Sequence, residues 1–143
     1  MREIKKVLVA NRGEIALRVF RTCRDLDIQC VAVYSEADKL APFVAYADEA
    51  YLLGPGPSAE SYLLSDKIID ICKKTGADAI HPGYGFLSEN AAFAQKVEES
   101  GIIFIGQTAH SIETMGDKIG SKNAVKANKV PLVPGMDKPV ESD

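Results

Sequence analysis

Short, uniformly apolar runs alternate with longer amphipathic segments over roughly the first hundred positions of the chain. The apolar runs are rich in aliphatic and β-branched residues, a pattern typical of strands buried on both faces of a sheet. The candidate strands are 6–10, 30–34, 49–53, 77–80 and 102–106. The segments between them place apolar residues at helical spacing. The candidate helices are 14–26, 44–47, 61–75 and 91–100. This alternation predicts a three-layer α/β fold with a doubly wound, mostly parallel, Rossmann-like sheet.

The pattern changes after Gly106. Residues 111–115 and 117–128 are helical and more polar, whereas 130–135 is extended and interrupted by prolines, and 136–143 has no apolar periodicity. We therefore predict a Rossmann-like domain over 1–112, followed by a helical connector and the start of a further region over 113–143. The sequence is expected to be one domain of a longer protein.

Within the predicted helices, apolar side chains indicate which faces are buried. In the first helix the inward side is predicted to carry Ile15, Val19, Phe20, Cys23 and Leu26. Gly76 is expected to end the third helix, because glycine readily takes the left-handed conformation found after helix ends.

The most specific stretch is 81–90, His-Pro-Gly-Tyr-Gly-Phe-Leu-Ser-Glu-Asn, which we call the 81–90 loop. Glycines on both sides of Tyr84 allow positive φ angles and a close approach of the backbone to a ligand. Ser88 is predicted to cap the following helix, with Glu89 in its first turn. A loop between a strand and a helix lies at the carboxyl edge of a parallel sheet, where open α/β sheets bind ligands. The alternative is a turn that only connects the two elements.

The turn after the first strand, Asn11-Arg12-Gly13, raises the possibility of a dinucleotide site. Glu36 or Asp38 stands near the position, about 20 residues downstream, of the acid that binds the ribose in such sites. The fingerprint needs three glycines, however, and only Gly13 is present. The turn is instead expected to form a rim at the ligand edge or simply a tight connection.

Composition limits the classes of function. The 143 residues are 46% hydrophobic and 26% charged, with a formal net charge of −3, so there is no electrostatic reason to expect nucleic acid or an anionic membrane as a partner. Apolar runs fall short of the ~20 residues that span a bilayer, and charges interrupt the N-terminus where a signal peptide would be apolar. Cys23, Cys30 and Cys72 form no C-x-x-C pair, which favours free thiols in a reducing cytoplasm.

Several motifs together support a family assignment. Asn11–Ala16, the 81–90 loop and Met115–Lys118 occur in the order and context found in the N-terminal domain of biotin carboxylase, which the chain resembles over nearly its whole length. Further matches are Ala47–Glu49, Phe104–Gly106 and Val133–Gly135. In that family a Rossmann-like domain precedes an ATP-grasp domain. The enzyme uses ATP, bicarbonate and Mg²⁺ to form carboxyphosphate, and transfers CO₂ to the N1′ of biotin on a carrier protein. The resemblance also implies a carboxyltransferase partner and a homodimer.

The resemblance implies roles for individual residues. Lys118 matches the lysine that contacts the nucleotide phosphates, a role suited to a compact ammonium group. His81, Gly83, Tyr84 and Gly85 match the loop that lines the biotin pocket. We expect His81 to fix this loop by hydrogen bonding rather than to act as a base, because the sequence names no partner that would orient it.

The first helix also carries Arg18, Arg21 and Asp25 on its polar side. Charged residues in such positions are usually only solvated. Since family members often pair through this helix, the resemblance implies a dimer-facing role for the three in the full-length enzyme.

The family's glycine-rich phosphate loop, second lysine, Mg²⁺-binding glutamates, general base and bicarbonate arginine would all follow Asp143. We therefore predict no catalytic residue and no metal site within this chain, and no tight binding of ATP, Mg²⁺ or biotin by the chain alone. The alternatives are the corresponding domain of another ATP-grasp ligase, such as carbamoyl-phosphate synthetase or an amino-acid ligase, and a non-catalytic nucleotide-binding module.

Two features bear on the acceptor of the carboxyl group. Met115 before Gly116 resembles the acetyl-CoA and propionyl-CoA carboxylases, whereas residues 50–52 resemble the pyruvate enzymes. We expect a parent acetyl-CoA carboxylase, which serves fatty acid synthesis.

Overall fold

The computed structural model describes residues 3–116, 118–127 and 130–131, without the side chains of residues 118, 119, 123 and 127. Five strands form one sheet in the order β3-β2-β1-β4-β5, and every ladder is parallel. The strands are β1 Lys6–Val9, β2 Gln29–Ser35, β3 Glu49–Gly54, β4 Ala79–His81 and β5 Ile103–Phe104. The predicted parallel α/β sheet is confirmed. The predicted extended segment 130–135 is described only at 130–131, and 136–143 lies outside the described residues.

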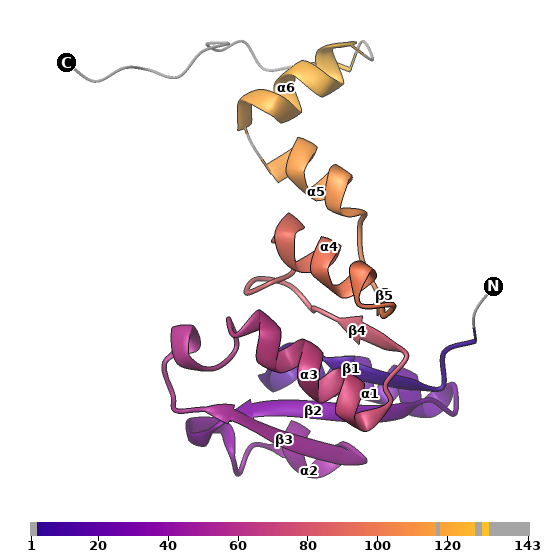
Figure 1. Cartoon of the computed structure of the whole chain (residues 1–143), viewed down its shortest axis with the longest axis vertical. Helices are drawn as coiled ribbons and strands as arrows, with labels where there is room; N and C mark the ends of the chain where they lie inside the picture. The colour runs from indigo at the N-terminus through magenta and orange to yellow at the C-terminus, as the bar shows by residue number, and fades with distance from the viewer. Residues whose placement is uncertain (1–2, 117, 128–129, 132–143) are drawn as a thin grey trace.

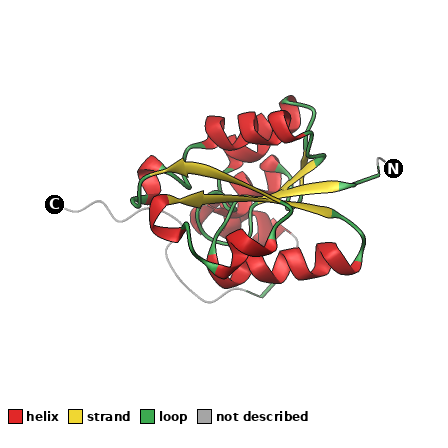
Figure 2. Cartoon of the chain, turned by 90° about the horizontal axis from the view of Figure 1, so that it is seen from below, coloured by secondary structure: helices red, strands yellow, loops and turns green. Residues whose placement is uncertain are grey.

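Helices cover both faces of this sheet (Figure 2). The helices are α1 Gly13–Asp25, α2 Pro42–Tyr46, α3 Ser65–Thr75, α4 Ala91–Glu99, α5 Ala109–Gly116 and α6 Lys118–Ala127, with two 3₁₀ turns at Glu36–Asp38 and Ser58–Glu60. The helices α5 and α6 continue away from the sheet (Figure 1), and α5 spans the predicted boundary at 112/113, which stays a prediction. Within the described residues, no helix is long and apolar enough to cross a membrane.

Each face of the sheet has its own hydrophobic core, because successive side chains of a strand point to opposite faces. On the face covered by α1 and α2, Val7 and Val9 pack with Phe20 and Phe43. On the face covered by α3 and α4, Leu8 packs in a larger cluster. The buried aromatic side chains of that cluster are Tyr62, Phe93 and Phe104. The uniformly apolar strands of the sequence follow from this double burial.

One predicted helix start and one predicted burial differ in the structure. Helix α3 begins at Ser65 rather than 61, because Ser61 and Tyr62 are buried in a turn in which Ser61 Oγ donates to Pro57 O over 2.8 Å. Leu26, predicted to be buried, follows the end of α1 and is 64% exposed. Gly76 ends α3 with a φ of 67°, as predicted.

The residue that caps α4 is Asn90 and not Ser88, so that prediction was wrong. The Asn90 side chain accepts a hydrogen bond from Phe93 N over 2.9 Å, which is the geometry of an N-cap. Ser88 N donates to Gly85 O over 2.9 Å, and this turn holds Ser88 and Glu89 outside the helix. The acceptor two residues further on takes the cap because the helix begins only at Ala91.

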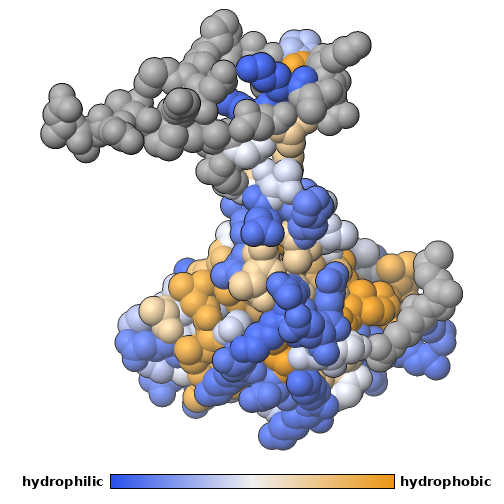
Figure 3. Space-filling view, turned by 45° about the horizontal axis from the view of Figure 1, so that its top comes forward, coloured by the Kyte–Doolittle hydropathy of each residue, from blue (hydrophilic) through white to orange (hydrophobic). Residues whose placement is uncertain are grey.

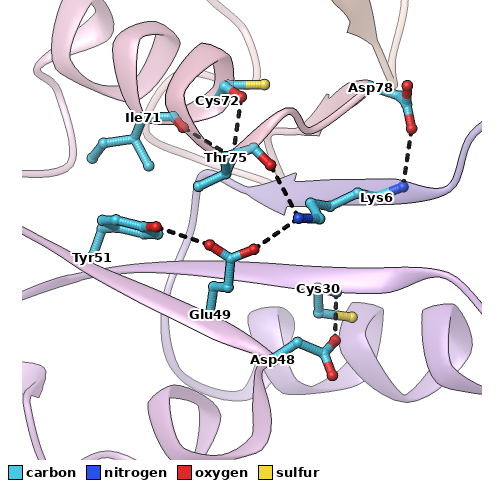
Figure 4. A network of polar contacts seen from close by, with 9 residues as sticks. All are labelled: Lys6, Cys30, Asp48, Glu49, Tyr51, Ile71, Cys72, Thr75 and Asp78. Carbon is cyan, nitrogen blue, oxygen red and sulfur yellow. Dashed lines mark hydrogen bonds and ion pairs between the residues drawn. The ribbon is translucent and has the colours of Figure 1, made fainter.

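A polar network joins the strands near their amino ends (Figure 4). Lys6 Nζ donates to Glu49 Oε1 over 2.8 Å and to the carbonyl of Thr75 over 3.0 Å. Tyr51 Oη donates to the other oxygen of Glu49 over 2.8 Å. The carboxylate of Asp78 accepts from the N–H of Lys6 over 3.1 Å. These contacts link β1, β3, the end of α3 and the approach to β4, opposite the edge where the predicted ligand loops lie.

The face of the molecule shown in Figure 3 mixes apolar and polar side chains over the sheet and its helices. The large exposed apolar residues are Leu26, Leu40, Leu52, Leu63, Tyr84, Met115 and Val130. Tyr84 belongs to the 81–90 loop, where the functional site is expected.

Candidate functional site

The strand order creates a switch point between β1 and β4. Helix α1 leads from β1 to β2 on one face, whereas α3 leads from β3 to β4 on the opposite face, so the chain winds in both directions from this pair. Val9 pairs with His81 at the end of the ladder, and Ala10 N donates to His81 O over 2.9 Å. The turn after β1 and the 81–90 loop therefore emerge side by side at the carboxyl edge, the usual ligand site of such sheets.

Asn11 joins these two segments. Its Nδ2 donates to the carbonyl oxygens of Pro82 and Tyr84, each over 2.9 Å. Its Oδ1 accepts from the N–H of Arg12 over 2.9 Å, and the residue is only 3% exposed. A buried amide with all these partners holds the first turn against the loop.

Three residues of the loop take positive φ angles. Gly83 and Gly85 have φ of 68° and 65°, and Phe86 has φ of 44°. The glycines adopt this conformation at little cost, whereas Phe86 is strained. Gly83 also needs to lack a side chain, since a Cβ there would lie 2.6 Å from Asn11 Nδ2.

His81 ends β4 and lies partly buried beneath the loop. Its Nδ1 accepts a hydrogen bond from Gly83 N over 3.0 Å. Burial lowers the pKa of the imidazole below its ordinary 6.5. A neutral ring with a lone pair on Nδ1 fits both observations. This hydrogen bond within the loop is of the kind expected for His81. The role of His81 in the enzyme stays a prediction.

Asp38, considered above as a ribose-binding acid, is already engaged by protein groups. It accepts from Ser35 Oγ over 2.8 Å and from Tyr62 Oη over 2.7 Å, and pairs with Arg12 over 3.1 Å. Burial alone would raise the pKa of this carboxyl, but the hydrogen bonds from Tyr62, Ser35 and Arg12 lower it below its usual range. The carboxylate thus stabilises the sheet edge.

Tyr62 is the residue of this region that sequence reasoning missed. It is 1% exposed, and its ring stacks on Phe86 with centroids 5.2 Å apart and planes 19° apart. Burial and the bond to Asp38 raise its pKa to about 12. No short motif marks Tyr62, because its partners are distant in sequence and meet it only in the fold.

The residues predicted to line the biotin pocket lie in one loop, 81–85. The residues predicted to face a dimer partner, Arg18, Arg21 and Asp25, are exposed on α1. Tyr84 is 58% exposed, and its hydroxyl group lies 3.3 Å from Glu14 Oε2. An open apolar hollow of about 600 Å³ beside α1 is lined by His81, Gly83, Tyr84 and Arg18 among others. Arg21 and Asp25 do not line it.

The predicted nucleotide-binding Lys118 is the first residue of α6. Its side chain lies outside what the structure describes. Among the residues whose side chains are described, no group of three or more His, Cys, Asp or Glu could hold a metal ion.

Comparison with known proteins settles the family. The family model described as "Biotin carboxylase, N-terminal domain" matches residues 3–112. The chain belongs to the biotin carboxylase N-terminal domain family. The resemblance in the motifs is thereby confirmed.

Members of this family with curated names are similar over almost the whole chain. A biotin carboxylase of Haemophilus influenzae is 56% identical over 140 residues, which are 98% of this chain and 31% of that protein. A pyruvate carboxylase subunit of Methanothermobacter thermautotrophicus is 56% identical over 135 residues, 94% of this chain and 28% of that protein. The chain thus spans about a third of the length of these relatives.

A solved structure shows the same fold. The biotin carboxylase domain dimer of the Hydrogenobacter thermophilus 2-oxoglutarate carboxylase, in complex with MgADP, ADP and bicarbonate, matches with a TM-score of 0.91 and 53% identity. The match covers 96% of this chain and 30% of that one. The biotin carboxylase fold, with the 81–90 loop at its switch point, is therefore established for this chain.

Proposed function

We propose that this chain is the N-terminal domain of an enzyme that uses ATP and bicarbonate to carboxylate biotin on a carrier protein. The observation that carries the proposal is the position of the 81–90 loop, which lies at the switch point of the sheet beside the turn after β1. The resemblance to biotin carboxylase implies that this loop lines the biotin pocket. The relatives named biotin carboxylase support the reaction.

In this proposal residues 81–85 of the loop form one wall of the biotin pocket. The N–H groups of Tyr84 and Gly85 have no hydrogen-bond partner among the described residues, so they are available to the polar ureido ring of biotin. An open hollow lined by His81, Gly83 and Tyr84 leaves space on one side of the loop, and Gly85 lines a second hollow beside Asn11 and Arg12. These loop residues bind and orient biotin, and none of them forms or breaks a covalent bond.

The other reactants are held mainly by residues outside this chain. Lys118 would donate to nucleotide phosphates and offset their charge, while ATP and Mg²⁺ are bound largely by the part of the enzyme that corresponds to the remaining two thirds of the relatives. Mg²⁺ neutralises the phosphate charge during phosphoryl transfer. We therefore expect neither catalysis nor tight binding of ATP, Mg²⁺ or biotin by the 143 residues alone.

Three partners complete the proposal: a biotin carrier, a carboxyltransferase and a second copy of the enzyme. The matched Hydrogenobacter structure is a dimer. The exposed charges Arg18, Arg21 and Asp25 on α1 support pairing through this helix in the full-length enzyme. The cysteines of this chain are free and buried, which supports a role in the reducing cytoplasm.

For the acceptor, we propose acetyl-CoA, on the basis of Met115 before Gly116. The matched biotin carboxylase and the matched pyruvate carboxylase component are both 56% identical to this chain, so similarity alone does not separate these acceptors. The carboxyl acceptor binds to another part of the enzyme, and its identity would be read from that part.

The test replaces the equivalent segment of the Haemophilus influenzae biotin carboxylase with residues 1–143. We expect the folded chimera to form ADP in the presence of bicarbonate and to carboxylate free biotin, and Lys118→Ala to weaken ATP binding strongly. A chimera that is folded but inactive would refute the proposal. The alternative of a non-catalytic nucleotide-binding module predicts tight ATP binding by the 143-residue chain itself, measurable by calorimetry.

A further inference from the structure

The two hydrogen bonds from Asn11 control the direction in which peptide groups of the 81–90 loop point. A trans peptide is planar, and its C=O and N–H point in opposite directions. The chain contains no cis peptide among the described residues. When Asn11 Nδ2 draws the carbonyls of Pro82 and Tyr84 toward itself, the N–H groups of Gly83 and Gly85 must therefore point away from Asn11.

These two N–H groups have different fates. The N–H of Gly83 meets His81 Nδ1 at 3.0 Å and is satisfied within the protein. The N–H of Gly85 has no partner among the described residues. The peptide group between Pro82 and Gly83 is thus held at both its C=O and its N–H. The peptide group between Tyr84 and Gly85 is held only at its C=O, which leaves its N–H available to a ligand.

We infer that Asn11 is the positioning residue of this loop, which presents the Gly85 N–H as a preformed donor to a neutral acceptor, the ureido group of biotin. The inference rests on the proposed function and adds the group that fixes the donor in advance. A donor that is already oriented loses little freedom when the ligand binds, and the ligand gains affinity accordingly.

The surroundings of Asn11 support a specific role for its amide. Gly83 lies so close that an added Cβ would approach Asn11 Nδ2 to 2.6 Å. Aspartate has the same shape but would place a charged oxygen opposite two carbonyl oxygens, which repels both. Alanine removes the donors and leaves room for water. The order of disturbance expected for the loop is therefore wild type, Asn11→Ala, Asn11→Asp.

The first arm of the test uses the 143-residue chain labelled with ¹⁵N. In the wild type, hydrogen exchange should be slow at Gly83 N–H and fast at Gly85 N–H. Asn11→Asp should accelerate exchange at Gly83 by about tenfold or more, because the bond to His81 is lost with the peptide orientation. The control is Asn90→Ala, which removes the cap at the other end of the loop but leaves the two carbonyl bonds in place. If Gly83 responds equally in both variants, the inference is overturned.

The second arm measures the chimera described above. Asn11→Ala should raise the KM for free biotin by about tenfold, while the kcat of bicarbonate-dependent ATP cleavage without biotin stays within about twofold. Asn90→Ala should leave the KM for biotin within about twofold. An unchanged biotin KM in Asn11→Ala would overturn the inference even in an active chimera. A wild-type chimera that is folded but inactive would instead overturn the proposed function and the assignment of biotin as the ligand. The hydrogen-exchange rates at Gly83 and Gly85 would then decide whether Asn11 positions the loop.

Discussion

The hydroxyl group of Tyr62 donates a hydrogen bond to the carboxylate of Asp38 over 2.7 Å. The hydroxyl oxygen of Tyr62 also accepts a hydrogen bond from Ser35 N over 3.1 Å, and the ring of Tyr62 stacks on Phe86. A single buried side chain thus connects the end of β2 with the 81–90 loop. The strained backbone of Phe86, with φ of 44°, is held by this stack.

Tyr62→Phe should therefore destabilise the protein without creating a cavity in the core. The ring remains, but Asp38 loses a donor and the buried Ser35 N–H loses its acceptor, which costs about 1–3 kcal/mol. Urea unfolding followed by circular dichroism would measure the loss. A further variant, Tyr34→Phe, removes the hydroxyl group of a partly buried residue, which has no hydrogen bond in the described structure, and it should change the free energy of unfolding by less than about 0.5 kcal/mol.

Gly83→Ala and Gly85→Ala separate steric contact from backbone conformation. Both glycines have positive φ, so each alanine should cost about 1 kcal/mol in conformation. Only the alanine at Gly83 meets Asn11 Nδ2, whereas a Cβ at Gly85 has nothing within 4 Å. We expect Gly83→Ala to be the more destabilising variant by thermal unfolding. Equal losses would show that Asn11 moves aside freely.

His81 should make stability depend on pH. Burial lowers the pKa of the folded imidazole below 6.5, so the unfolded chain binds a proton at higher pH than the folded one. The contribution of the neutral ring is complete above pH 6.5 and declines as the pH falls below 6.5 through the folded pKa. His81→Asn offers Gly83 an acceptor that does not titrate. The difference in unfolding free energy between wild type and variant should change in this window, and a constant difference would contradict the prediction.

The ion pair of Lys6 and Glu49 should contribute measurably to stability. Their side chains are 19% and 34% exposed, and Glu49 also accepts from Tyr51. A double-mutant cycle with Lys6→Met and Glu49→Gln should give a coupling of about 1–2 kcal/mol. The pair of Lys5 and Glu3, with side chains 75% and 77% exposed, provides the control and should show almost none.

The same pair contributes to acid sensitivity. Hydrogen bonds from Lys6 and Tyr51 lower the pKa of Glu49 below 4.5, so its contribution is present above pH 4.5 and is lost as the pH falls through the folded pKa. This decline begins at a lower pH than that of His81, near 4.5 instead of 6.5. The two effects can therefore be distinguished in one pH series of unfolding curves.

Much of the fold could be predicted from local patterns. Five apolar runs and the helices between them correspond to strands and helices of the structure, because burial on both faces leaves a continuous apolar signal. The ends of the helices were predicted less accurately. The early start predicted for α3 and the burial predicted for Leu26 failed because helical periodicity continues past the point where turns and caps end the helix.

The position of the candidate site could be predicted from the sequence, but not the contacts that hold it together. The two glycines around Tyr84 indicated a ligand loop, and the motifs indicated its family, which the comparison confirmed. The true cap of α4 required the hydrogen bond from Phe93 N to Asn90. The division at 112/113 and the phosphate contact of Lys118 stay predictions.

By itself, the sequence determined the order of strands and helices, the parallel α/β class and the position of the 81–90 loop, because each depends on neighbouring residues. Only the tertiary structure decided that β1 lies beside β4, that Asn11 binds the carbonyls of Pro82 and Tyr84, and that Tyr62 joins Asp38 to Phe86. These contacts join residues 24 to 73 positions apart. Their geometry depends on the packing of the whole sheet, and no local pattern encodes it.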